Sequence, residues 1–476
     1  MKLVENTKCK RFNQGEIMNQ NIDLTSGNIV DKLVRLSLPI MGTSFIQIAY
    51  SLTDMIWVGK NGSNSVAAVG TAGFYPWLAM AFIMISKIGG EIKVAQSVGE
   101  KNLKDTKNYI KSAIEINLIL STLYTLILIV FRHNLIGFFK LGDTQVIDMA
   151  TSYLVLIALG MVFYFINPVF TSIFVGLGNS KSPFKINTIG LIVNIILDPI
   201  LIFGIGPFPK LGVNGAAMAT VTAQIVVSLC FMYMIAKDRE EHFRIKLFRD
   251  IEFEYHKTLC ILGLPVALQN GLFTAFSMVM GVIVASFGPV AIAVQKVGSQ
   301  IESISWNSCD GFASALSSFV GQNFGAKKID RINKGTKDAL IGVLIWGTLT
   351  TLILVFGGEY IFKVFINEPE AISKGKDYLI ILGYSQLFMC LEICIAAIFK
   401  GLGRTYIPSI IIIILTGLRI PLALILSKSN ILGLNGIWWS IAISSIFKGI
   451  ILLGILIYLR KAKKLYKIKY DTVENI

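Results

Sequence analysis

The feature that most constrains this chain is a series of twelve apolar segments, each about 20 residues or longer. A helix of about 20 residues crosses the roughly 30 Å hydrocarbon core of a bilayer. Hydrophobic residues make up 54% of the 476 and charged residues only 15%, outside the usual balance of soluble proteins. We therefore expect an all-α polytopic membrane protein with twelve transmembrane helices. The expected spans are 33–58, 66–96, 109–131, 151–176, 184–206, 212–236, 257–285, 290–321, 338–357, 377–400, 406–428 and 432–459.

Short motifs recur in the same order in the two halves of the chain, which indicates an internal duplication. The pairs are SLPIMG and GLPVAL, AQSVGEKN and GQNFGAKK, GLGNSKSP and GLGRTYIP, and GVNGA and GLNGI; the first three pairs are offset by 225 or 226 residues. Six spans per half is an even number, so both halves enter the membrane from the same side. Such parallel repeats form two bundles related by a pseudo-two-fold axis along the membrane normal, typical of alternating-access transporters.

The repeat and the hydropathy pattern together divide the chain into five expected parts. Two six-helix lobes are separated by a charged linker and flanked by two polar segments. In order along the chain, the parts are a cytoplasmic segment 1–32, an N-terminal lobe 33–236, a cytoplasmic linker 237–256, a C-terminal lobe 257–459 and a cytoplasmic tail 460–476.

Basic residues are distributed unevenly among the loops. The terminal segments and even-numbered loops hold 32 of the 44 Lys and Arg residues, and the odd-numbered loops only eight. By the positive-inside rule, both termini are cytoplasmic and the protein lies in the plasma membrane. The first 30 residues are polar, so we expect no cleavable signal peptide. The net charge of +15, concentrated in these loops, predicts contact with anionic lipid and no binding of nucleic acid. The Lys-, Ile- and Asn-rich composition indicates a bacterial source.

The stretch NIILDPILIFG, residues 194–204, places an acid inside an apolar helix. Counted at about 1.5 Å per residue, Asp198, Asp54 and Thr220 lie at one depth near the outer face, with Asn194 one turn deeper. An intramembrane acid is costly and usually functional. Carboxylate, amide and hydroxyl oxygens can hold Na⁺ or share a proton. We therefore predict a cation-coupling site here, with Asp54, Asn194 and Asp198 as possible Na⁺ ligands; the alternative is a structural hydrogen-bond network.

The second half does not repeat these acids, because Met280 aligns with Asp54 and Ala423 with Asp198. Its own buried charges are expected near mid-membrane on four helices. They are Asp310, Glu392, Arg419 and Lys448. Two acids and two bases can pair into a neutral cluster. A role in substrate binding or in coupling the lobes is the other interpretation.

Other polar residues carry simpler expectations. Glu302 lies on the same span as Asp310, towards its outer half, where we expect it to border a cavity. Glu115 lies near the inner interface and is expected to be solvated. The three His residues lie in or beside loops, so a histidine proton relay is not expected. Five of the six Cys residues lie in apolar spans, and the Cys residues are expected to pack there rather than to bind metal.

These motifs resemble the multidrug and toxic compound extrusion (MATE) family over nearly all of the chain beyond residue 30. The resemblance rests on the SLP opening, DMIWVG, the two GLG motifs, NIILDPILIFG and GVNGAAMAT. It is greatest to the branch that includes DNA-damage-inducible and archaeal members. It implies antiport, in which a small organic and often cationic substrate leaves in exchange for inward Na⁺ or H⁺, with no cofactor besides that ion. We expect a monomer.

The resemblance also implies roles for particular residues. The positions that match the family's N-lobe cation site are Asp54, Asn194, Asp198 and Thr220, and Pro39 matches a proline at which the first helix bends. Members with a cation site in the C-terminal lobe carry an acid on helix seven, where this chain has Gln269 and Asn270. That departure argues against a second site of this kind, although Glu392 remains available and Gln269 could belong to the cavity or coupling network.

Three other functions occur among polytopic membrane proteins. A lipid-linked saccharide flippase of related fold is expected to have a strongly cationic cavity and often extra helices. A membrane-embedded enzyme is expected to carry a motif such as HExxH or GxSxG, and the sequence contains neither. A passive channel is expected to repeat a filter-like motif, which is also missing. Export by antiport is the function that the sequence favours.

Overall fold

The computed structural model describes residues 21–237, 241–366, 368–428 and 430–466, and the regular structure in these ranges is helical throughout. Contact between helices divides the chain into two compact units, an N-terminal unit (Met1–Gly263) and a C-terminal unit (Leu264–Ile476). Most of the predicted segment 1–32, part of the linker and most of the tail lie outside the described residues.

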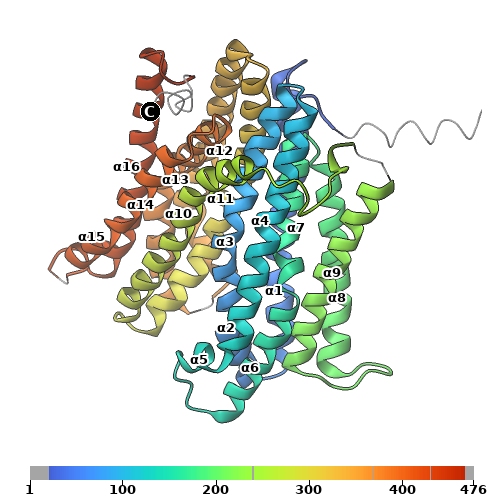
Figure 1. Ribbon diagram of the computed structural model, residues 1–476. Helices are drawn as coiled ribbons and strands as arrows, with labels where there is room; N and C mark the ends of the chain where they lie inside the picture. The colour runs from blue at the N-terminus through green and yellow to red at the C-terminus, as the bar shows by residue number, and fades with distance from the viewer. Residues whose placement is uncertain (1–20, 238–240, 367, 429, 467–476) are drawn as a thin grey trace, which may run out of the picture. The chain divides into compact units, whose positions relative to one another are not determined.

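The N-terminal unit contains the first six spans. Two of them consist of consecutive helices, because α2 and α3 are separated by a single residue and α6 and α7 meet at a 50° bend. The helices are α1 (Ile29–Lys60), α2 (Ser63–Ala72), α3 (Phe74–Gly99), α4 (Leu103–Val130), α5 (Arg132–Gly137), α6 (Thr144–Leu159), α7 (Met161–Gly176), α8 (Lys181–Phe203), α9 (Val213–Lys237) and the short η1 (Glu241–Phe243). The helix α3 packs on α4 and α7, and α8 packs on both α1 and α9 (Figure 1).

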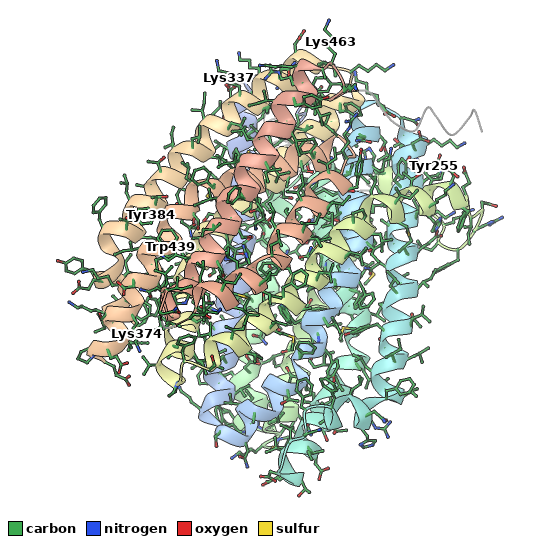
Figure 2. The ribbon with its side chains drawn as sticks, turned by 90° about the vertical axis from the view of Figure 1, so that its left-hand side faces the viewer. Tyr255, Lys337, Lys374, Tyr384, Trp439 and Lys463 are labelled. Atoms are coloured by element: carbon green, nitrogen blue, oxygen red, sulfur yellow. The ribbon has the colours of Figure 1, made fainter. Side chains whose placement is uncertain are left out.

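The remaining six spans begin with α10, whose first residues belong to the N-terminal unit. The helices are α10 (Phe253–Ala285), α11 (Pro289–Gly325), α12 (Ile329–Lys363), α13 (Pro369–Gly401), α14 (Tyr406–Gly417), α15 (Arg419–Leu426) and α16 (Leu434–Lys461). The central helix of the C-terminal unit is α13, which packs on α11, α12 and α16. Figure 2 shows Lys337 and Lys463 at one end of this unit and Lys374 at the other, as expected for spans that alternate in direction.

The length and composition of the helices agree with twelve membrane crossings. Ten spans in the described ranges are long and apolar enough to cross a bilayer, and the bent pair α6 and α7 makes an eleventh. The twelfth is α11, which is 37 residues long but more polar than the others. Large apolar side chains on the spans remain exposed, including Val282 (72%) and Phe356 (76%), as expected for surfaces that contact lipid.

The linker buries Glu115, a residue that the sequence predicted to be solvated. Glu115 on α4 is buried rather than solvated, with only 1% of its surface exposed. Its carboxylate accepts a hydrogen bond from the backbone N–H of Phe248 (2.6 Å), and its other oxygen lies 2.8 Å from His256 Nε2. Lys111, one turn earlier, donates to the carbonyls of Arg249 and Asp250. The folded linker covers Glu115 and removes it from water.

Candidate functional site

The four residues of the predicted cation site come from three helices that pack together. Asp54 lies on α1, Asn194 and Asp198 on α8, and Thr220 on α9. Because α8 packs on both α1 and α9, it brings its two polar residues between the other two helices. The structure therefore gathers in one region the side chains that depth alone had grouped.

Asn194 and Asp198 form the buried base of the site. Both side chains are fully buried (0% exposed), and Asn194 Nδ2 donates a hydrogen bond of 3.1 Å to Asp198 Oδ1. The four-residue spacing makes this contact possible, because positions i and i+4 lie on one face of a helix. Among the described residues, Asn194 Oδ1 and Asp198 Oδ2 find no hydrogen-bond partner. Two buried acceptor oxygens are thus left without a donor.

Asp54 approaches this pair from α1. It is partly exposed, but its Oδ1 is buried and also has no hydrogen-bond partner within the described ranges. Its charge interacts with that of Asp198, so the two carboxylates are neighbours. No Lys, Arg or His of the described chain forms an ion pair with either acid. The arrangement concentrates negative charge without a resident counter-ion.

A cavity of about 370 Å³ lies beside these acids within the N-terminal unit. Asp54 and Thr220 are part of its wall, and most of the remaining wall is apolar or aromatic. The aromatic residues on the wall are Tyr50, Trp77, Tyr153 and Tyr164. A concave, mostly apolar cavity with a few polar groups is the usual form of a small-molecule site.

The sequence did not single out several of these wall residues, although helical spacing was enough to predict two of them. Tyr50 lies one turn before Asp54 and Gln224 one turn after Thr220, so helical spacing could have identified both. The Tyr50 hydroxyl lies near Thr220 without reaching full hydrogen-bond geometry. Gln224 is held from behind by Asn167, whose Nδ2 donates to Gln224 Oε1 at 2.8 Å.

Tyr153 and Tyr164 could not have been placed from the sequence. They stand on α6 and α7, on either side of the 50° bend that contains Gly160. A Cβ atom at Gly160 would lie 2.5 Å from Val221 Cγ2, so the lack of a side chain allows the bend to approach α9 beside Thr220.

Pro39 lies inside α1, which continues as one helix from Ile29 to Lys60. A proline in a helix removes one backbone hydrogen bond and weakens the helix locally. The predicted bend at Pro39 stays a prediction.

The predicted charge cluster of the C-terminal unit forms, but with a different second acid. Lys448 Nζ lies 3.0 Å and 2.9 Å from the two oxygens of Glu392, and both side chains are buried. Asp310, in contrast, is exposed and makes no ion pair in the described chain, so its predicted place in the cluster is wrong. The other buried acid of this region is Glu302, which accepts a hydrogen bond of 3.0 Å from Gln386 Nε2 and lies near Arg419 and Lys448 without an ion pair among the described residues.

The two other members of the predicted network bind polar neighbours. Arg419 Nε and Nη2 donate to the hydroxyls of Ser444 and Ser445, each at 3.0 Å. Gln269 Oε1 accepts a hydrogen bond of 2.9 Å from Ser409 Oγ, which fixes α10 against α14. A role of either residue in substrate binding or coupling stays a prediction.

Comparison with known proteins supplies the family context for this geometry. The model of the MatE family matches this chain twice, at residues 39–200 and 265–425. The two matches begin at Pro39 and Pro265, the prolines of the aligned SLP and GLP motifs. The internal duplication inferred from the motifs therefore corresponds to two copies of one family unit.

Curated relatives match over most of their length. A protein of Thermotoga maritima named probable multidrug resistance protein NorM is 26% identical over 430 residues, covering 88% of this chain and 90% of the relative. The FAD transporter of Shewanella oneidensis is 26% identical over 442 residues, covering 91% and 95%.

Solved structures share the fold. A MOP superfamily transporter from Pyrococcus furiosus aligns with a TM-score of 0.85 and 23% identity, covering 95% of this chain and 100% of that one. The MATE transporter VcmN of Vibrio cholerae in its bent form aligns with a TM-score of 0.82 and 20% identity, covering 92% and 98%. The predicted class, an all-α polytopic protein of twelve helices in two six-helix bundles, is confirmed.

Proposed function

We propose that this chain, which belongs to the MatE family of multidrug and toxic compound extrusion transporters, exports lipophilic organic cations in exchange for Na⁺ or H⁺. Family membership makes it a multi-pass membrane transporter and not an enzyme. The relatives named as multidrug resistance proteins support an efflux role. The direction of exchange, the coupling ion and the cationic character of the substrate are parts of our proposal.

The observation that carries the proposal is the pair of carboxylates without a counter-ion. A charged side chain placed in the middle of a membrane helix costs about 2.5–3.5 kcal/mol on insertion scales. Asp198 is fully buried and has an acid, rather than a base, as its charged neighbour. Neutralisation by a bound cation or a proton would remove that cost. We infer that the pair is occupied by the coupling ion in part of the transport cycle.

The unpartnered oxygens also suit a small hard cation. Asp54 Oδ1, Asp198 Oδ2 and Asn194 Oδ1 have no donor in the described chain and belong to a class of ligand that such ions prefer. Transition-metal binding has less support, because the described residues contain no group of three or more His, Cys, Asp or Glu side chains placed to hold one. A proton shared between Asp54 and Asp198 is the other chemistry that this geometry supports.

The cavity explains how ion and substrate could be exchanged. A flat lipophilic cation could contact Tyr50, Trp77 and Tyr164 through its apolar surface and through cation–π interaction. Its positive charge would be attracted by Asp54, on the same wall. The coupling ion and the substrate would then compete for one negative region, so each would weaken binding of the other. Such competition is the thermodynamic requirement of antiport.

Transport by purified protein in liposomes tests the proposal. The probe is ethidium, a flat lipophilic cation, and its movement is measured under an imposed Na⁺ gradient, an imposed pH gradient, or neither. We expect transport against the probe's own gradient with at least one ion gradient, and loss of that transport when an ionophore collapses the gradient. Equal probe movement with and without gradients would contradict antiport. The same measurement identifies the coupling ion.

A further inference from the structure

The C-terminal unit buries an ion pair, Glu392 with Lys448, whereas the N-terminal unit buries acids that have no ion-pair partner among the described residues. Only 7% of Glu392 and 4% of Lys448 is exposed. The ammonium nitrogen lies almost equally far from both carboxylate oxygens, at 3.0 Å and 2.9 Å. The ammonium donates a hydrogen bond to Glu392 Oε1, while Oε2 lies within ion-pair distance but receives no hydrogen bond among the described residues.

Two further charged residues, Glu302 and Arg419, lie near the pair, and hydrogen bonds hold both in place. Glu302 accepts a hydrogen bond of 3.0 Å from Gln386 Nε2, and the Tyr378 hydroxyl lies beside it. Arg419 is held by two serine hydroxyls of α16, the helix that also carries Lys448. Two acids, Glu302 and Glu392, and two bases, Arg419 and Lys448, therefore lie in this region, and one acid and one base form the ion pair.

The ion pair changes what the Glu392 carboxylate can bind. Desolvating two opposite charges is expensive, and the pair persists only when the geometry is good and the remaining polar groups are satisfied. Once the pair has formed, a free Na⁺ or proton would have to displace an ammonium that is covalently attached and cannot diffuse away. Its effective concentration at Glu392 is therefore very high.

We propose that the Lys448 ammonium is a built-in counter-cation that occupies the cation site of Glu392 permanently. The C-terminal unit then contains a cation-binding carboxylate that is closed to exchangeable ions, and removal of Lys448 opens it to Na⁺ or H⁺. This inference does not rest on the proposed transport function, because it concerns ion binding by the C-terminal unit and is measured without substrate.

Thermal unfolding of the purified full-length protein in detergent tests the inference. Asp54→Asn and Asp198→Asn are introduced together as a background, which removes the acids of the N-terminal unit. Unfolding temperature is measured in NaCl or choline chloride of equal ionic strength, at acidic and at alkaline pH. We expect the background protein to show no specific effect of Na⁺ and only a small effect of pH.

Adding Lys448→Met to this background should create a response. Glu392 would then be a buried carboxylate without its ion-pair partner, and the protein should be stabilised by Na⁺ or by lower pH. At Na⁺ tenfold above its dissociation constant the expected rise in unfolding temperature is on the order of 1–2 °C. Lys448→Arg keeps the positive charge and should show no response. Lys448→Met combined with Glu392→Gln should also show none, because the carboxylate has been removed.

Two outcomes would overturn the inference. One is a specific Na⁺ response of the background protein that disappears with Glu392→Gln, since Glu392 would then bind exchangeable Na⁺ despite Lys448. The other is a folded Lys448→Met variant that is equally stable in all conditions. If Lys448→Met does not fold, Glu392→Gln alone gives the converse test. The Lys448 ammonium then has no carboxylate partner, so the protein should become more stable as the pH rises. A stability that does not change with pH would contradict the pairing of Lys448 with Glu392.

Discussion

The two units share their backbone constraints but differ in the charges that they bury. Gly212 and Gly433, in the matching GVNGA and GLNGI motifs, have the same φ of 54°. Three residues later, a Cβ atom at Gly215 would overlap the Leu201 carbonyl, and one at Gly436 would overlap the Leu426 carbonyl. The same turn thus brings the same pair of helices together in both units.

A second pair of glycines repeats this equivalence. A Cβ atom at Gly176 would lie 3.0 Å from the Glu91 carbonyl, and one at Gly401 would lie 2.5 Å from the Ser317 carbonyl. Glu91 and Ser317 are themselves 226 residues apart. Close approach of backbones is therefore what the duplication has retained, while side chains of different chemistry fill the space between the helices.

The buried polar positions show how far the chemistry differs. Asn194, which contacts Asp198 in the N-terminal unit, aligns with Arg419. Asn167 is the repeat equivalent of Glu392, which follows it by 225 residues. Asn167 accepts a hydrogen bond of 2.6 Å from Ser228, whereas Glu392 forms an ion pair with Lys448. One unit holds acids that lack a cation, and the other supplies its own cations. One helical framework can therefore bury either acids without a counter-ion or an ion pair.

The largest expected effect comes from the same chemical change made in each unit. Glu392→Gln leaves the buried Lys448 without its partner and should destabilise the protein by about 3–5 kcal/mol. Asp198→Asn removes a buried charge that has no counter-ion and should leave stability unchanged or raise it. Chemical unfolding in mixed micelles measures both. Equal destabilisation by the two changes would break the comparison.

A double-mutant cycle separates the ion pair from simple packing. Lys448→Met and Glu392→Gln should each be more harmful than their combination, because the double variant contains no unpaired charge. Strict additivity of the two unfolding free energies would show that the residues are not coupled. This measurement uses the protein with its N-terminal acids intact.

An intermediate effect is expected at the glycines that the two units share. Gly215→Ala and Gly436→Ala each force a Cβ atom against a carbonyl of the neighbouring helix. Overpacking of this kind costs about 1–3 kcal/mol, and we expect similar losses for both variants because the contacts correspond. Gly281→Ala, at a helix position with open space around it, is the matched control. A large loss in one unit alone would show that the repeated motif has different structural roles.

The smallest expected effect concerns the shape of the cavity. Gly160→Ala would press on the side chain of Val221, which can move, so stability should fall by less than for the two glycines above. Displacement of Val221 should shift Thr220 and weaken ethidium binding severalfold. Gly70→Ala, on the same wall but with open space around it, should bind ethidium normally. Unchanged fluorescence titrations for Gly160→Ala would argue against this cavity as the substrate site.

Sequence alone predicted the helices well, because the length and composition of an apolar span follow directly from the thickness of the bilayer. Even α11, with its polar residues, was predicted as a span (290–321) from its apolar composition. The contact of Asn194 with Asp198 was also predictable, since both residues lie on one helix. Tyr153 and Tyr164 were not, because their position depends on how two helices pack around the bend at Gly160.

The C-terminal unit shows a further limit of such reasoning. Depth along a helix indicates which residues share a level, but it does not indicate which face they occupy. Glu302 and Asp310 are eight residues apart, which rotates one relative to the other by about 80° beyond two full turns. The structure places Glu302 in the charge cluster and Asp310 on an exposed face. Only the packing of α11 on α13 decides between them.

The most direct test of the central claim, that Asp54 and Asp198 together bind the coupling ion, is gradient-driven transport by variants in liposomes. Asp54→Asn and Asp198→Asn should each reduce ethidium transport to the level without a gradient, while the protein still inserts and unfolds normally. Asp148→Asn, the same change at an exposed acid of α6, is the control and should transport like the unmodified protein. Wild-type transport rates in both site variants would contradict the account, because the buried acids would then serve only the packing of the helices.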